Sequence, residues 1–522
     1  MNPLLTAGLT GLALLLPPAL AQASPGSDAI NRYCSGCHQP QDGPESWSRI
    51  SQQRKTPEGW DMTIIRMQTM HGVTVPMEAR RDIVKYLSDT RGLAPEESAP
   101  QRALIERRLN RVESFDHPTF QAMCARCHTG GRPLLQRRPQ KEWERLVHFH
   151  VGQFPTLEYQ SMARDRDWLD IALNDIAPWL GDSHGLESEA WQAWQDNGID
   201  SPDGDWQLWG HWPGEGDFYA DVTITAADGE DAYDLTLDGA FTDGRQLDGE
   251  GQAMVYTGYE WRANLNLNGH DFKQVLDLAG DRPNGRIFDD RDEAFGIQVE
   301  MLPADEVATP ALVASQPAAL QAGMRGRLVL LGHGLGKGGI DLGEGVTVHE
   351  VVERSDSRVV LDVETASDLT PGWLPVQVGE ADADTLLAGY QTVDRLELSP
   401  DLGVARVASE ATPAVSGVFS AQGYLDNPEG DDIPLGRVPV TWSVAPWDEI
   451  AEDEEDVKYA GTLDAATGIF SPGGAGPNPL RRFDTNNAGN LRVTASVVGQ
   501  EDVQDDAHLI VTVQRWNNPP LR

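Results

Sequence analysis

The sequence predicts a multidomain protein in which an all-α N-terminal region is followed by three all-β domains, an antiparallel barrel and two immunoglobulin-like sandwiches. The chain has 522 residues, which is more than one hydrophobic core usually serves. Its charge is also divided: residues 1–185 hold 21 basic and 21 acidic side chains, so the whole net charge of −40 comes from the remainder. Finally, apolar residues recur at helical spacing before about residue 185 and alternate in short runs after it.

Residues 1–23 have the features of an export signal. They contain no charged side chain, an apolar run over 9–16 precedes two prolines, and Ala-Gln-Ala at 21–23 offers a small-x-small cleavage pattern. We therefore expect a signal peptide over 1–23. Because no later stretch has the roughly 18 uninterrupted apolar residues of a membrane span, we expect a soluble mature protein. Its acidity argues against nonspecific nucleic-acid binding.

All four cysteines lie in two C-x-x-C-H motifs, at 34–38 and 124–128. This motif attaches c-type haem: two thiols form thioethers with the haem vinyl groups, and the following histidine ligates the iron. A zinc site or a redox dithiol also uses C-x-x-C, but neither requires a histidine directly after it twice. The sequence therefore predicts two covalently bound haem c groups and no disulfide. The attachment residues are Cys34, Cys37, Cys124 and Cys127, and the first iron ligands are His38 and His128.

The segments that follow the two motifs repeat each other. RKTPEGW at 54–60 matches RRPQKEW at 137–143, and each leads toward an amphipathic segment. We expect helices over Glu78–Leu87 and from Trp168 to about Ala177, with Pro178 beyond the second helix. Residues 24–189 are therefore predicted to form two tandem cytochrome c folds.

The shared register of the repeats favours Met67 and His150 as the sixth iron ligands, each seven residues after its tryptophan. One haem would then have His/Met and the other His/His coordination. Because an axial methionine raises the haem potential, the two potentials would differ and suit directional electron transfer. Met70 and His71 compete with Met67, and His148 competes with His150.

Three basic residues of the repeats, Arg54, Arg137 and Arg138, are candidates to pair with haem propionates. The alternative is that they form a solvated basic surface. Two six-coordinate haems would carry electrons one at a time and leave no open position for a substrate. The N-terminal region is thus expected to transfer electrons, and we expect no catalytic residue in this chain.

The acidic remainder is expected to fold as a barrel over 190–303 and as sandwiches over 304–392 and 393–522. The glycine-rich segment 332–336 is interpreted as a sandwich loop, and the acidic run 448–456 as a solvated loop. No catalytic motif is evident here, which favours docking surfaces. The clearest strand patterns are 221–225, 233–237, 263–267, 296–302, 327–331, 358–363, 373–378, 438–444, 491–498 and 509–513.

The segments flanking the C-x-x-C-H motifs carry a family resemblance. RKTPEGWDMTIIRMQTMHG at 54–72, RRPQKEWERLVHFHVGQ at 137–153 and LEYQSMARDRDWL at 157–169 resemble the α subunit of quinohemoprotein amine dehydrogenase. The order and length of the predicted domains agree with it. The resemblance implies a periplasmic heterotrimer that oxidatively deaminates primary amines to aldehyde and ammonia.

The resemblance also implies partners. A small γ subunit would carry cysteine tryptophylquinone, and a β-propeller β subunit would accompany it. Because every cysteine here is committed to haem, this chain cannot supply that quinone. Electrons would pass from the quinone through both haems to a soluble acceptor such as azurin or a cytochrome c.

Two other functions fit the motifs. A dihaem peroxidase would need one haem that can open a coordination position to peroxide. An exported cytochrome without a catalytic partner would use its β domains to bind a cell surface.

Overall fold

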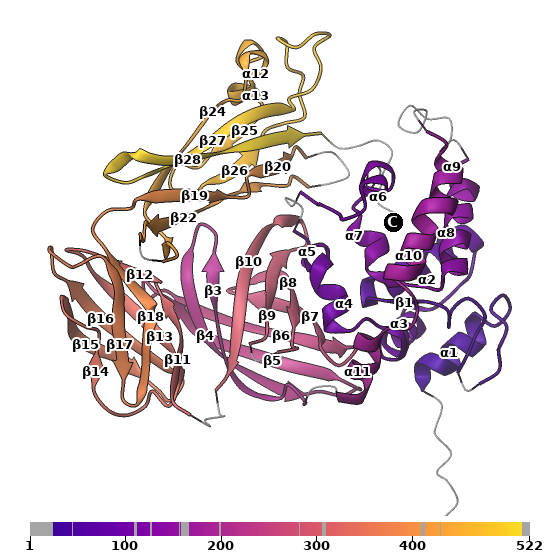
Figure 1. The fold of residues 1–522 in the computed structure, drawn as a ribbon, viewed down its shortest axis with the longest axis horizontal. Coiled ribbons are helices and arrows are strands. Elements are labelled where there is room, and N and C mark those ends of the chain that lie inside the picture. The colour runs from indigo at the N-terminus through magenta and orange to yellow at the C-terminus, as the bar shows by residue number, and fades with distance from the viewer. Residues whose placement is uncertain are drawn as a thin grey trace, which may run out of the picture.

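The computed structural model describes residues 24–43, 45–108, 112–125, 128–155, 157, 166–197, 200–280, 282–304, 309–408, 413–428 and 430–513. The signal peptide expected over 1–23 and the attachment residue Cys127 lie outside these residues. A helical N-terminal region lies beside a β-barrel, and two further groups of β-sheets follow (Figure 1). None of the helices in the described residues is both long and apolar enough to cross a membrane.

The first repeat is built from three helices, α1 (Pro25–Tyr33), α2 (Pro57–His71) and α3 (Met77–Arg91). Thr56 caps α2, since its side chain accepts a hydrogen bond from the Gly59 N–H, and Pro57 occupies the first turn, where no donor is needed. α2 ends at Gly72, whose φ of 69° is the left-handed conformation that glycine adopts without strain. The expected helix 78–87 lies within α3.

The second repeat contains α6 (Pro118–Met123), α7 (Gly131–Leu134), α8 (Gln140–Gln153), α9 (Trp168–Ile171) and α10 (Ala177–Ser183). The prediction that the last helix ends near Ala177 is wrong. A π-helical turn over Ala172–Ile176 connects α9 to α10. The hydrogen-bond pattern restarts there, so Pro178 falls in the first turn of α10, where its missing N–H costs nothing.

The two repeats contact each other through a two-stranded ribbon. β1 (Arg54–Lys55) pairs antiparallel with β2 (Gln136–Arg137), and Arg54 lies opposite Arg137, its counterpart in the repeat. The repeat tryptophans also match: the Trp60 Nε1 donates to the carbonyl of Arg91 at 3.1 Å, and the Trp143 Nε1 donates to that of His184 at 3.2 Å. The repeat is therefore structural, with approximate two-fold symmetry about the ribbon.

Short helices link the repeats to each other and to the barrel. They are α4 (Pro95–Ser98), η1 (Ala99–Gln101) and α5 (Arg102–Ile105) between the repeats, and α11 (Glu189–Asn197) after them.

The predicted antiparallel barrel is confirmed as a closed eight-stranded sheet in which β10 also pairs with β3. Alternate side chains point inward along each strand and fill the interior, among them Phe218, Leu247 and Trp261, each at most 1% exposed. The strands are β3 (Gly204–Trp212), β4 (Gly216–Ala226), β5 (Ala232–Phe241), β6 (Gln246–Tyr256), β7 (Glu260–Leu267), β8 (His270–Asp277), β9 (Asn284–Asp289) and β10 (Asp292–Pro303).

Two four-stranded sheets follow the barrel and enclose one apolar core. The glycine-rich segment 332–336 leaves the end of β13 as expected for a loop, and Leu335 within it is fully buried in that core. The strands are β11 (Ala311–Gln316), β12 (Ala319–Gln321), β13 (Arg325–His333), β14 (Ile340–Asp341), β15 (Val346–Arg354), β16 (Arg358–Thr365), β17 (Gly372–Val378) and β18 (Ala381–Tyr390).

The last region has a four-stranded sheet and two three-stranded sheets. The acidic run 448–456 is not the expected loop: it forms α12 (Glu449–Asp453) and begins α13 (Asp456–Tyr459). Asp456 is buried because its carboxylate binds Arg481 at 2.8 Å. The strands are β19 (Arg395–Ser399), β20 (Leu402–Arg406), β21 (Gly417–Val418), β22 (Ser420–Leu425), β23 (Ile433–Arg437), β24 (Val440–Pro446), β25 (Gly461–Leu463), β26 (Ile469–Pro472), β27 (Gly489–Val497) and β28 (Gln500–Thr512).

The barrel is central: it packs against the helical region and the sheets of β11–β18, and the last region also contacts it (Figure 1). Leu93 and Leu135 of the helical region pack on Phe288 of the barrel. Arg262 of β7 reaches Glu58 of α2, with Nε 2.6 Å from the carboxylate. The helical region is thus held by the barrel through apolar and ionic contacts.

Gly92 lies where the end of α3 touches the β6–β7 turn. A Cβ at this position would collide with the Ser88 carbonyl oxygen and the Thr257 side chain. Gly92→Ala is therefore expected to lower the free energy of unfolding by about 1–3 kcal/mol, the usual cost of overpacking. Gly326→Ala, where no atom lies within 4 Å of the added Cβ, is the control and should change stability little. Equal urea midpoints for both variants and the parent would contradict this expectation.

Candidate functional site

The two C-x-x-C-H motifs occupy equivalent places, each directly after a helix. The Cys34 N–H donates to the Ile30 carbonyl at 2.8 Å, which adds Cys34 to the last turn of α1, and the Cys124 N–H donates to Phe120 in α6 at the same distance. Cys37 and His38 then donate to the Cys34 carbonyl at 3.1 and 2.9 Å. The turn so formed keeps both thiols of the first motif on one short segment, as attachment to one porphyrin edge requires.

Both thiols described in the first motif are free, Cys34 half-buried and Cys37 exposed. Burial, together with the neighbouring Cys37, raises the pKa of the Cys34 thiol to about 11. Cys34 packs against the core of the first repeat, and Cys124 against the core of the second. The residues present in each repeat therefore fit one haem, with one edge of that haem inside the repeat.

The histidines of both motifs have a fixed ring orientation. The Nδ1 of His38 lies 2.8 Å from the Ser48 carbonyl oxygen, and the Nδ1 of His128 lies 2.8 Å from that of Thr129. Because a carbonyl only accepts, each Nδ1 donates to it, and Nε2 is the ring nitrogen that remains to face a metal. This is the usual state of a metal-binding imidazole.

The two histidines that compete for the second haem lie on different faces of helix α8. His150 lies seven residues after Trp143 and shares its face, and its Nδ1 donates to the Leu146 carbonyl at 2.8 Å, which leaves Nε2 free as in His128. Burial is the main cause that lowers the pKa of His150, and the nearby His128 lowers it further. His148 is exposed on another face of α8. His150 is therefore partly buried within reach of the charge of His128, whereas His148 is exposed.

The helix α2 presents Met67 in the equivalent position. Met67 is half-buried and continues the face of Trp60 and Ile64, which belong to the core of the first repeat. Met70 is 51% exposed, and His71 is an exposed residue in the last turn. Met67 thus remains the best placed of the three.

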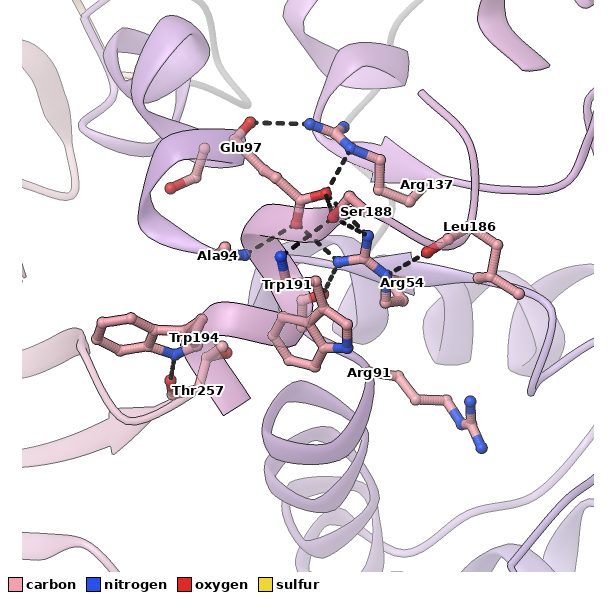
Figure 2. A network of polar contacts seen from close by, with 12 residues as sticks. Arg54, Arg91, Ala94, Glu97, Arg137, Leu186, Ser188, Trp191, Trp194 and Thr257 are labelled. Atoms are coloured by element: carbon pink, nitrogen blue, oxygen red, sulfur yellow. Dashed lines mark hydrogen bonds and ion pairs between the residues drawn. The ribbon is translucent and has the colours of Figure 1, made fainter. Parts of the chain in front are cut away.

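Arg54 and Arg137 both bind a carboxylate of the chain itself, and neither belongs to a solvated surface (Figure 2). Arg54 makes a two-pronged ion pair with Glu97 at 2.7 and 2.8 Å, and the Arg137 Nε donates to the same carboxylate at 2.9 Å. Both arginines and Glu97 are buried. Arg54 also donates to the carbonyls of Leu186 and Gly92 and to the Ser188 hydroxyl. All five N–H groups of Arg54 are used, which corrects the expectation that it pairs with a propionate.

Arg138 is placed differently from the other two arginines. It is 5% exposed, and its guanidinium lies 5.4 Å from the centre of the Trp143 ring. Its side chain donates to Gln136 Oε1, with a shortest distance of 2.7 Å. Arg138 therefore stays a candidate for a propionate.

Glu97 is the functional residue that sequence reasoning missed. It lies in α4, between the repeats, and no motif or repeat marks it. Its Oε2 also accepts from the Ala94 N–H at 2.9 Å, which completes the first turn of α4. One carboxylate thus joins the equivalent arginines of both repeats and fixes their mutual orientation.

The Glu97 network predicts an acid-sensitive stability. Burial alone would raise the pKa of Glu97, but the Arg54 hydrogen bonds and the Arg137 charge outweigh it and lower the pKa from 4.5 to about 2. A carboxyl with a depressed pKa stabilises the fold above pH 4.5, and this contribution, on the order of 3 kcal/mol, is lost as the pH falls toward 2. Melting temperatures of the parent and of Glu97→Gln should therefore differ most at pH 7 and converge only as the pH reaches about 2. A difference that does not depend on pH would contradict this.

Solved structures offer weak likenesses. The chain is 17% identical to a redesigned β-barrel, mFAP1, bound to DFHBI, with 19% of this chain and 93% of that chain covered and a TM-score of 0.17. The extracellular cadherin domains 1–4 of protocadherin gamma B7 give 11% identity, 56% and 67% coverage and 0.16. Domains 5–6 of the S-layer protein SbsC give 12%, 39% and 99%, and 0.17. These values are too low to inform the fold or the function. No curated protein matches the chain.

Family models, in contrast, cover almost the whole chain. The model for the haem-binding region of the quinohemoprotein amine dehydrogenase alpha subunit matches residues 24–191. Those for domains II, III and IV of the same subunit match residues 200–304, 309–391 and 396–521 in that order. The helical region is thus a haem-binding region and the chain a subunit of an oxidoreductase. With four consecutive matches to one subunit, the chain belongs to the family of quinohemoprotein amine dehydrogenase alpha subunits.

Proposed function

We propose that this chain is the electron-transfer subunit of a periplasmic amine dehydrogenase and that it carries two covalently bound haem c groups. The observation that supports this most directly is that each C-x-x-C-H motif begins at a helix end and that the histidine of each motif has its Nδ1 on a carbonyl. Haem iron would supply one-electron transfer at each site. Cys127 would complete the second attachment pair.

The chain's own side chains would ligate the two irons. His38 and Met67 would ligate the first, and His128 and His150 the second. The buried faces of α2 and α8 orient Met67 and His150. The Glu97 network holds the two repeats at a fixed separation, on which electron transfer between them depends.

The proposal includes partners and an address. A γ subunit would carry cysteine tryptophylquinone, where a primary amine is oxidised to aldehyde and ammonia, and a β-propeller β subunit would join the complex. Electrons would leave to a soluble acceptor, azurin or a cytochrome c. Residues 1–23 would direct export and be removed.

The decisive experiment adds a primary amine to the purified native complex and follows the visible haem bands. We expect reduction of both haems in the complex. The isolated chain should show none with amine alone, although dithionite should reduce it. A pull-down should recover two smaller subunits, one of which stains for quinone. Acid-acetone extraction that removes all haem from the denatured chain would overturn covalent attachment.

A further inference from the structure

Lys55 and Arg138 occupy matching positions in the two repeats. Each directly follows an arginine that binds Glu97, and because successive side chains of a strand alternate, each lies on the other side of the β1–β2 ribbon. Lys55 is 2% and Arg138 5% exposed. The Lys55 Nζ lies 4.9 Å from the centre of the Trp60 ring, as Arg138 lies over Trp143. Both cations are therefore held in place by the tryptophan of their own repeat.

Neither cation has a carboxylate partner of its own in the described part of the chain. The Lys55 Nζ donates to the Thr63 hydroxyl at 2.7 Å, and Arg138 donates to the Gln136 amide oxygen. The negative charge of Glu142 favours the charged form of Arg138, but the Glu142 carboxylate is already ion-paired with Arg49 and Arg145. This is unusual in a chain with 81 acidic residues, where Arg54 and Arg137 share Glu97.

Arg66 adds a third positive charge to the same region. Burial lowers the pKa of Lys55 well below its usual range, and the charges of Arg138 and Arg66 lower it further. Burial lowers the pKa of Arg138 to about 9, and Arg66 contributes to this as well. Cations gathered in this way away from water are costly unless an anion joins them. Buried Lys55 and Arg138, each over a tryptophan ring and without a carboxylate partner of its own, together with Arg66 thus form a cluster that favours an anionic ligand.

The position of the cluster identifies the anion. Arg66 precedes Met67 on α2, and its guanidinium lies 5.6 Å from the ring of Phe149, which precedes His150 on α8. The cluster therefore borders both helices that carry the candidate sixth ligands. Each haem has two carboxylates, its propionates, and Lys55, Arg66 and Arg138 would hold such a group here.

We propose that Lys55 and Arg138, assisted by Arg66, bind propionates of the two haems and thereby raise their reduction potentials. The assignment rests on the proposed function, since it needs haem in both repeats. A positive charge beside a propionate compensates its negative charge and favours the electron on the nearby iron. The repeated pair of basic residues then has two distinct roles: the first residue of each pair locks the repeats, and the second binds cofactor.

The test uses the native complex with Lys55→Met or Arg138→Met in this chain, and spectroelectrochemical titration of both haems. Each variant should lower the equilibrium constant for reduction of at least one haem by about tenfold, which is 59 mV for one electron. Lys141→Met removes a charge from an exposed residue of α8 and serves as the control, with a change below about twofold expected. Lys55→Arg and Arg138→Lys keep the positive charge, so the haem reduction potentials of these two variants should stay near those of the parent.

Resonance Raman spectra give a second readout, since the propionate bending bands should shift in the two methionine variants and not in Lys141→Met. If a methionine variant does not fold, the same bands and potentials are measured on Lys55→Arg and Arg138→Lys. Shifted propionate bands in these variants support direct contact between the side chain and the propionate. Unshifted propionate bands contradict it. Two covalent haems with unchanged potentials and bands in folded methionine variants would overturn the assignment alone. A chain without covalent haem would overturn the proposed function as well.

Discussion

Glu97→Gln is expected to lower the free energy of unfolding of the haem-binding region by about 3–5 kcal/mol, the cost of removing one partner from a buried ion pair. Arg54 and Arg137 are both buried and share this carboxylate. A neutral amide would leave two like charges together without a counter-ion. The amide also has one acceptor oxygen in place of two, so it cannot accept from the Ala94 N–H and from both arginines as the carboxylate does. Urea denaturation of the purified chain measures the effect through the midpoint.

The neighbouring Glu96 provides the matched control. Glu96 is an exposed residue of the same helix, so Glu96→Gln removes the same charge without disturbing the network. Its effect should stay within about 0.5 kcal/mol. A loss of less than 1 kcal/mol in Glu97→Gln would mean that the carboxylate does not hold the two repeats together.

His150→Ala is expected to convert one of the two haems from low-spin to high-spin, because the iron loses its sixth ligand. Half of the low-spin signal in electron paramagnetic resonance should therefore disappear. Amine-driven reduction of the haems should slow in the same preparation. The structural reason is the ring orientation of His150, whose Nδ1 is engaged with the Leu146 carbonyl and whose Nε2 is available.

His148→Ala is the control for this prediction, since His148 is exposed and lies two residues away on the same helix. It should leave both low-spin signals intact. Loss of a low-spin signal in His148→Ala, with none in His150→Ala, would show that the repeat register assigns the wrong histidine.

The sequence was sufficient for those features that depend on local spacing. The C-x-x-C-H motifs, the repeated Arg-basic-x4-Trp pattern and the alternating strands of the barrel each follow from neighbouring residues. The helix continuing past Pro178 could not be predicted, because a π-helical turn depends on how the backbone packs and not on a residue signal. Asp456 in the acidic run is buried for a similar reason: its partner Arg481 lies 25 residues further along the chain.

The role of Arg54 shows why polar contacts are the hardest part to foresee. A basic residue near a haem motif suggests a propionate partner, but the actual partner, Glu97, is 43 residues away and comes from the linker. Only the folded ribbon reveals that Arg54 and Lys55 lie on opposite sides. The pattern of the repeat therefore marked which basic residues belong together, but it could not show that Arg54 and Arg137 bind a carboxylate from the linker.

Equivalent residues of the two repeats face each other across the β1–β2 ribbon. This arrangement limits which smaller proteins could form the same ribbon. Two separate copies of a single repeat, associating through the same surface, would place Arg54 against its own equivalent as an isologous contact does, like charge against like charge. The neutralising carboxylate occurs once, in the covalent tether between the halves. A pair of repeats without the Glu97 segment would therefore have an uncompensated pair of arginines where they meet.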